Sequence, residues 1–205
     1  MAGRAEIHNA ALEIHMRIRS GVLAVLMTVA LGAPALAAQG SGADTYIERA
    51  NYDVFKDVSS QVNRYVNFTV FDDVSASVVD GVVTLSGRVT MPYKRQDLER
   101  RVSRVNGVRA VQNQIEVLPV SRFDDELRYR IARAIYGNPT FWHYAAMANP
   151  PIHIVVERGH VTLSGVVNSN VERALARSLA IGFGEFSVKN ELKTDAEMKD
   201  ILEKM

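Results

Sequence analysis

The chain has 205 residues, of which 47% are hydrophobic and 23% charged, a composition that predicts globular structure over most of its length. The absence of cysteine excludes disulfides, thiolate metal sites, a cysteine nucleophile and a lipid-carrying N-terminal cysteine. With a formal net charge of +1, the chain lacks the excess of cations that bulk binding to nucleic acid requires.

The N-terminal segment has the pattern of a secretory signal peptide. Residues 21–33 form a short apolar run, which Arg17 and Arg19 precede and a small-residue cleavage site ending at Ala37 follows. This run is too short to span a bilayer comfortably, so we expect residues 1–37 to be removed on export. The exported chain would then have no transmembrane segment and equal numbers of basic and acidic residues.

Two short segments flank this signal. The fifteen residues before Met16 are polar and unpatterned, and a signal peptide that starts at Met16 would have an ordinary length, so we expect Met16 to be the true start. Residues 38–45 are small and polar, and we expect them to form a flexible leader.

An internal repeat follows the leader. Residues 80–89 are echoed by residues 158–167 at an offset of 78, and residues 107–115 by residues 184–192 at an offset of 77. Two matches in the same order at nearly the same offset indicate a duplication. We expect one module over residues 46–119 and a second over residues 120–193.

Each copy alternates between helical and strand periodicity. In the first copy, apolar residues recur at helical spacing from Val54 to Tyr65, then at every second residue on both sides of Asp80-Gly81, a tight-turn pair. A second helical stripe, which Thr90 is expected to cap, and a last strand complete the copy. The fold class is therefore predicted to be α+β, with two tandem α-β-β-α-β modules, each a three-stranded sheet covered on one face by two helices. A capping pattern at Thr194 and Glu197 predicts a short C-terminal helix over residues 194–205.

The paired G-x-V-T-L-S-G hairpins, each followed by a helix and a V-x-N-x-[IL] strand, resemble the BON domain family. The residues that carry this structural motif are Gly81, Gly87, Gly107, Asn113, Gly159, Gly165, Gly184 and Asn190. We expect the two asparagines to form structural hydrogen bonds that fix the hairpin. The resemblance implies a non-enzymatic periplasmic protein that supports outer-membrane integrity or osmotic-stress tolerance. Some relatives bind phospholipid, and without a cysteine this chain is more similar to the soluble branch than to the lipoproteins.

The second copy carries nine extra residues between its first helix and its first strand, within residues 137–151. This insertion holds the only tryptophan. Its aromatic residues and the arginines of the preceding helix could form a membrane-contact site for anionic phospholipid; the residues are Arg128, Arg130, Arg133, Phe141, Trp142 and Tyr144. The alternative is that the aromatic residues form a core between the two modules.

Other candidate features are weaker. Lys94, Arg95, Arg100, Arg101 and Arg104 make one helix of the first module basic, as either a solvated face or a contact for an anionic partner.

Catalysis has little support in the sequence. A hydrolase would need His143 and Ser164 within hydrogen-bond reach of each other. The histidines lack metal-ligand spacing, and no cofactor signature occurs, so we expect no enzyme activity, metal or cofactor.

The sequence thus predicts a periplasmic envelope-maintenance or osmotic-stress protein that associates with phospholipid surfaces, with envelope proteins as the other candidate partners. The alternative is a protein-binding or chaperone-like stress adaptor, whose exposed sheet edges pair with client strands.

Overall fold

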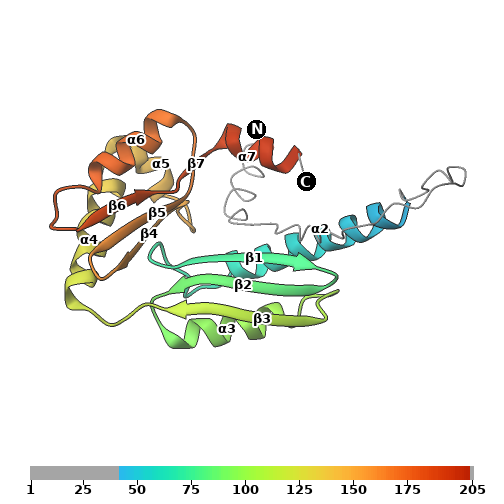
Figure 1. The fold of residues 1–205 in the computed structure, drawn as a ribbon. Coiled ribbons are helices and arrows are strands. Elements are labelled where there is room, and N and C mark those ends of the chain that lie inside the picture. Colours follow the sequence, from blue (N-terminus) through green and yellow to red (C-terminus); the bar gives the residue numbers. More distant parts are fainter. Residues whose placement is uncertain (1–41, 204–205) are drawn as a thin grey trace, which may run out of the picture.

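A computed structural model describes residues 42–203 (Figure 1). The predicted signal peptide and Met16 lie outside the described residues, as do residues 38–41 of the predicted leader. Helix α2 (Gly42–Asn63) begins inside that leader, so residues 42–45 are helical.

The first module contains α2, strands β1 (Asp73–Val79) and β2 (Val82–Val89), helix α3 (Pro92–Val102) and strand β3 (Ala110–Val117). The strand order is β1-β2-β3, with β2 antiparallel to β1 and parallel to β3. Helices α2 and α3 pack on one face of this sheet (Figure 1). The core between them includes Phe55, Val58, Leu85 and Leu98, all of which are buried.

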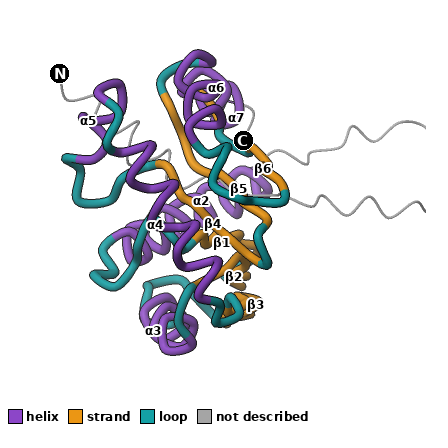
Figure 2. Tube along the Cα trace, turned by 90° about the vertical axis from the view of Figure 1, so that its left-hand side faces the viewer, coloured by secondary structure: helices purple, strands orange, loops and turns teal. Residues whose placement is uncertain are grey.

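The second module repeats this order with α4 (Arg122–Tyr136), β4 (Ile152–Glu157), β5 (His160–Val167), α6 (Asn170–Leu179) and β6 (Ser187–Asn190). The predicted fold class of two tandem α-β-β-α-β modules is confirmed. The insertion forms a 3-10 turn, η1 (Pro139–Phe141), and a short helix, α5 (Trp142–Ala145), which packs beside α4 (Figure 2).

The second module does not end at residue 193. A further strand, β7 (Lys193–Thr194), pairs with β5 and makes this sheet four-stranded. Helix α7 (Asp195–Glu203) follows and buries Met198 against Val166. Its first turn is the capping box that Thr194 and Glu197 predicted, with Thr194 N donating to Glu197 Oε2 at 2.9 Å and Glu197 N to Thr194 Oγ1 at 3.3 Å.

Both hairpins turn through two residues of positive φ. Asp80 and Gly81 have φ of 51° and 74°, and Arg158 and Gly159 have φ of 51° and 78°. In the second module the buried carboxylate of Asp124 accepts hydrogen bonds of 2.8 Å from the backbone N–H groups of Arg158 and Gly159. The start of α4 is thereby tied to the hairpin turn.

The two modules are joined through the loop between α2 and β1, residues 64–72. Ile154 N, on the edge strand β4, donates a 2.7 Å hydrogen bond to Val70 O. The ring of Phe71 packs edge-on against Tyr129 of α4 at a centroid distance of 5.2 Å. Because this loop covers part of the β4 edge, that edge is partly closed to other strands.

Candidate functional site

The six residues predicted to contact lipid do not form one surface. Arg128 is 4% exposed, and Phe141 and Tyr144 are fully buried, so the prediction is wrong for these three. The side chains of Arg130, Arg133 and Trp142 are exposed.

Arg128 is buried because it lies on the apolar stripe of α4. It is flanked at helical spacing by Leu127, Ile131 and Ile135, which all enter the core of the second module. Its Nη2 donates to the carbonyl oxygen of Val156 on β4 at 2.5 Å, and its Nη1 pairs with Asp125. This guanidinium group therefore ties α4 to the sheet.

Phe141 and Tyr144 belong to the core of the second module itself. The alternative prediction, a core between the two modules, is therefore wrong for these residues as well. Tyr144 Oη donates a 2.7 Å hydrogen bond to Glu172 Oε2 and accepts one of 2.9 Å from Asn168 N. Burial, and then the bond to the Glu172 carboxylate, raise the pKa of the Tyr144 phenol, which stays neutral.

An ion pair occupies the equivalent place in the first module. Lys94 Nζ lies 2.6 Å from Asp72 Oδ2, and both side chains are buried. Asp72 also accepts hydrogen bonds of 2.7 and 2.8 Å from the N–H and hydroxyl of Thr90. Thr90 is therefore not the helix cap; Met91 is the N-cap of α3, without a side-chain hydrogen bond. Lys94 likewise does not belong to a solvated basic face.

The three remaining residues share the outer side of α4 and α5, here named the α4 surface: Arg130, Arg133 and Trp142. Trp142 is 61% exposed, and its Nε1–H donates a 3.2 Å hydrogen bond to Gly137 O at the end of α4. This bond anchors the indole where the helix ends. Arg130 pairs with Glu126 at 3.6 Å, an exposed pair that leaves most of its surface in water.

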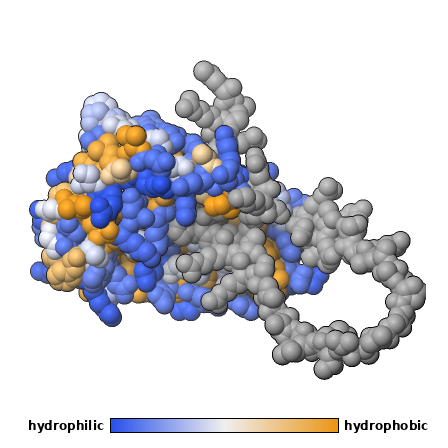
Figure 3. Space-filling view, turned by 45° about the horizontal axis from the view of Figure 1, so that its top comes forward, coloured by the Kyte–Doolittle hydropathy of each residue, from blue (hydrophilic) through white to orange (hydrophobic). Residues whose placement is uncertain are grey.

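An apolar loop next to Arg130, residues 181–186, was not among the predicted site residues. Ile181 is exposed, Phe186 is 73% exposed, and the guanidinium of Arg130 lies 5.2 Å above the ring of Phe183. On the face drawn in Figure 3, hydrophobic residues gather at the end of the molecule that the second module forms. The run Ile-Gly-Phe-Gly-Glu-Phe is the sequence signal that could have indicated this loop.

The 181–186 loop is fixed by its own carboxylate. Glu185 accepts 2.8 Å hydrogen bonds from the N–H groups of Gly182 and Phe183. Slight burial raises the pKa of Glu185, but these donors outweigh it and hold the pKa below its ordinary value. These hydrogen bonds fix the backbone of the 181–186 loop, which carries the exposed side chains of Ile181 and Phe186.

The motif asparagines bind the helix that precedes their strand and not the hairpin. Asn113 Nδ2 donates to Arg95 O at 3.0 Å, and Asn190 Nδ2 donates to Arg173 O at 2.9 Å. The six motif glycines all adopt positive φ: Gly81, Gly87, Gly107, Gly159, Gly165 and Gly184.

The residues considered for hydrolysis do not form a catalytic arrangement. Ser164 is fully buried on β5, and its hydroxyl has no hydrogen-bond partner among the described residues. His143 instead lies 3.3 Å from the side-chain amide of Asn168. Within residues 42–203, no group of three or more potential metal ligands occurs, and no helix has the length and apolarity to cross a membrane.

Two α+β modules of the same element order, each with its own core, define a duplicated two-domain protein. The BON domain model matches residues 56–119 and 124–196, more than half of the chain. The chain belongs to the BON domain family and carries two copies of the domain. Members of this family are typically periplasmic stress or membrane-associated proteins, and they are generally non-enzymatic.

Two solved structures of CdsD, a structural protein of the type III secretion system of Chlamydia trachomatis, are similar at 15% identity. The match to its C-terminal domain has a TM-score of 0.25 and covers 60% of this chain and 56% of that one. The second has a TM-score of 0.26 and covers 75% and 98%. Similarity at this level carries no argument about function. No curated protein matches the chain.

Proposed function

We propose that this protein is a non-enzymatic envelope-maintenance or osmotic-stress protein of the periplasm, which associates with anionic phospholipid surfaces through its second module. The observation that carries the proposal is the α4 surface, which exposes a tryptophan and two arginines, with the ring of Phe183 from the apolar 181–186 loop packed against Arg130. The predicted signal peptide of residues 1–37 supports the compartment.

The chemistry of this surface suits the boundary between lipid headgroups and acyl chains. The indole of Trp142 is amphipathic and exposed, and Phe186 offers apolar area at the same module. Arg130 and Arg133 would lie at the depth of the phosphates, where each cation near an anionic surface contributes about 1 kcal/mol. The attraction should therefore depend on anionic lipid and weaken with salt.

Sedimentation with vesicles tests this proposal. Residues 38–205, which include every residue that the structure describes, are mixed with phosphatidylglycerol-containing and with purely phosphatidylcholine vesicles. We expect binding only to the anionic vesicles. The double variant Arg130→Gln/Arg133→Gln should bind about 30-fold more weakly, since two such contacts are lost, and Trp142→Ala should bind more weakly as well.

Matched controls come from exposed residues elsewhere. Tyr93→Ala removes an exposed aromatic side chain from the first module, and Arg109→Gln/Arg177→Gln removes two exposed charges. Both should bind like the wild type. Equal binding by all variants, or no binding by the folded wild type, would refute the assignment.

One observation favours the alternative, a protein-binding adaptor. Strand β3 pairs only with β2 and leaves its other edge without a strand partner among the described residues. Such an edge can accept an extended client segment. If vesicles are not bound, strand addition at the free edge of β3 becomes the function to test.

A further inference from the structure

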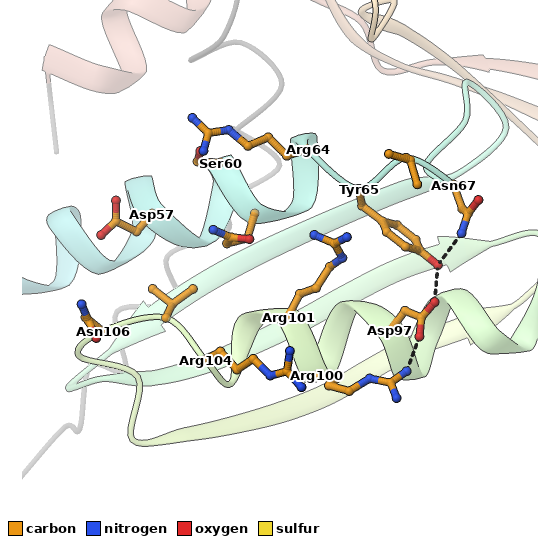
Figure 4. Close-up of a pocket in the computed structure, with 13 residues that line it drawn as sticks. Asp57, Ser60, Arg64, Tyr65, Asn67, Asp97, Arg100, Arg101, Arg104 and Asn106 are labelled. Carbon is orange, nitrogen blue, oxygen red and sulfur yellow. Dashed lines mark hydrogen bonds and ion pairs between the residues drawn. The ribbon is translucent and has the colours of Figure 1, made fainter.

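A pocket of 740 Å³ lies in the first module, between the C-terminal half of α2 and helix α3 (Figure 4). Its volume falls within the range of about 300–1,000 Å³ that small-molecule sites occupy. Four arginines contribute to its lining: Arg64, Arg100, Arg101 and Arg104. Only two acidic residues, Asp57 and Asp97, line it with them, so the pocket has a surplus of positive charge.

One of these two acidic residues is already engaged. Asp97 pairs with Arg100 and accepts a 2.7 Å hydrogen bond from Tyr65 Oη. That hydrogen bond, followed by the charge of Arg100, holds the pKa of Asp97 below its ordinary value, so the carboxylate stays ionised and matches Arg100.

Three guanidinium groups remain without a carboxylate partner within residues 42–203: Arg64, Arg101 and Arg104. Arg101 is held in place, because its Cζ lies 5.1 Å from the centroid of the buried Tyr65 ring. Arg64 and Arg104 are exposed lining residues that lie just beyond the C-terminal ends of α2 and α3, the two helices that border the pocket. Like charges gathered in one hollow repel each other unless an anion lies between them.

We infer that this pocket binds a phosphate ester. Guanidinium groups donate two parallel hydrogen bonds to phosphate oxygens, and three unpaired ones around one hollow can surround such a group. Neutral side chains of Ser60, Gln61, Asn67 and Asn106 complete the lining and suit the organic part of the ester. The inference goes beyond the proposed function, which rests on the α4 surface of the other module.

The ester can be a soluble metabolite or the headgroup of a lipid, and the experiment separates the two. Binding of glycerol 3-phosphate to residues 38–205 is measured by calorimetry at low salt, without any membrane. Sedimentation with phosphatidylglycerol vesicles is measured in parallel. The variants are Arg101→Gln and Arg104→Gln, with Arg177→Gln on α6 as the control for loss of one exposed charge.

Loss of one charge-assisted contact should weaken binding about tenfold. A soluble ester that binds the wild type and Arg177→Gln, but both pocket variants about tenfold more weakly, supports the pocket and the soluble source. If only vesicle binding weakens in the pocket variants, the ester is a lipid headgroup. Equal binding by all variants in both arms, or no binding in either, overturns the inference.

Arg104→Gln keeps the test valid if Arg101→Gln unfolds the module, since Arg104 is exposed. Thermal unfolding of each variant shows whether the fold is kept. The calorimetric arm contains no lipid, so its outcome does not depend on whether the α4 surface binds membranes.

Discussion

The phenol of Tyr144 donates a 2.7 Å hydrogen bond to the carboxylate of Glu172, at the place where Lys94 and Asp72 form an ion pair in the first module. Glu172 lies 78 residues after Lys94, the same offset as the two hairpins. Both contacts join the segment before the first strand to the N-terminal turn of the helix that follows the hairpin. The two modules therefore make the equivalent contact with different chemistry: an ion pair in the first module and a phenol–carboxylate hydrogen bond in the second.

Tyr144→Phe should destabilise the second module by about 1–3 kcal/mol, because Glu172 and Asn168 N each lose a buried partner. Urea unfolding of the variant measures this loss. Vesicle binding should not change at temperatures where the variant is folded, since the hydroxyl faces the core. A variant as stable as the wild type but deficient in vesicle binding would contradict this role.

Asp72→Ala should be more damaging, with a loss of about 3–5 kcal/mol, because it leaves the Lys94 ammonium buried and unpaired. The double variant Asp72→Ala/Lys94→Met removes that charge as well and should recover part of the loss. Denaturant unfolding of both variants tests the pair. A double variant less stable than the single one would show that the lysine has another stabilising partner.

Gly165→Ala should cost more than about 3 kcal/mol of unfolding free energy, because a Cβ there would lie 1.8 Å from Pro151 O at a φ of +106°. Gly184→Ala is the matched control. Its φ is +93°, but no atom lies within 4 Å of the added carbon, so only backbone strain of about 1–2 kcal/mol is expected. Thermal unfolding compares the two, and similar losses would rule out the close contact as the cause.

Glu197 should make the docking of α7 pH-dependent. Hydrogen bonding to Thr194 N, and then the ion pair with Arg173, lower the pKa of Glu197 below the ordinary value of 4.5. A lowered folded-state pKa stabilises the fold fully above the unfolded-state pKa, and this stabilisation is lost as the pH falls through the lowered value. The difference in stability between the wild type and Glu197→Gln should therefore be largest at neutral pH and shrink below pH 4.5. Urea unfolding across this range measures it, and a constant difference would contradict the linkage.

Much of the architecture could be predicted because the hairpins carry local signals. The two-residue turns at Asp80-Gly81 and Arg158-Gly159 and the alternating apolar residues on either side specify strands without tertiary information. Strand β7 could not be predicted in this way, since a strand of two residues is too short to show an alternation of apolar and polar side chains.

Only part of the predicted lipid-contact site is exposed, because the residue types in a segment do not determine which side chains face the core and which face solvent. The helical stripe could have placed Arg128 inward, since it shares the face of Ile131 and Ile135. The loop at Phe186 could not be predicted from the sequence, because only tertiary structure brings the Phe186 ring beside Phe123 of α4.

The fluorescence of Trp142 reports directly on membrane contact at the α4 surface, because Trp142 is the only tryptophan in the chain and is 61% exposed. Titrating residues 38–205 with phosphatidylglycerol-containing vesicles should shift its emission to shorter wavelength as the indole enters the headgroup region, and added salt should reverse the shift. An emission spectrum unchanged by anionic vesicles, from a protein that remains folded, would contradict membrane contact at the α4 surface.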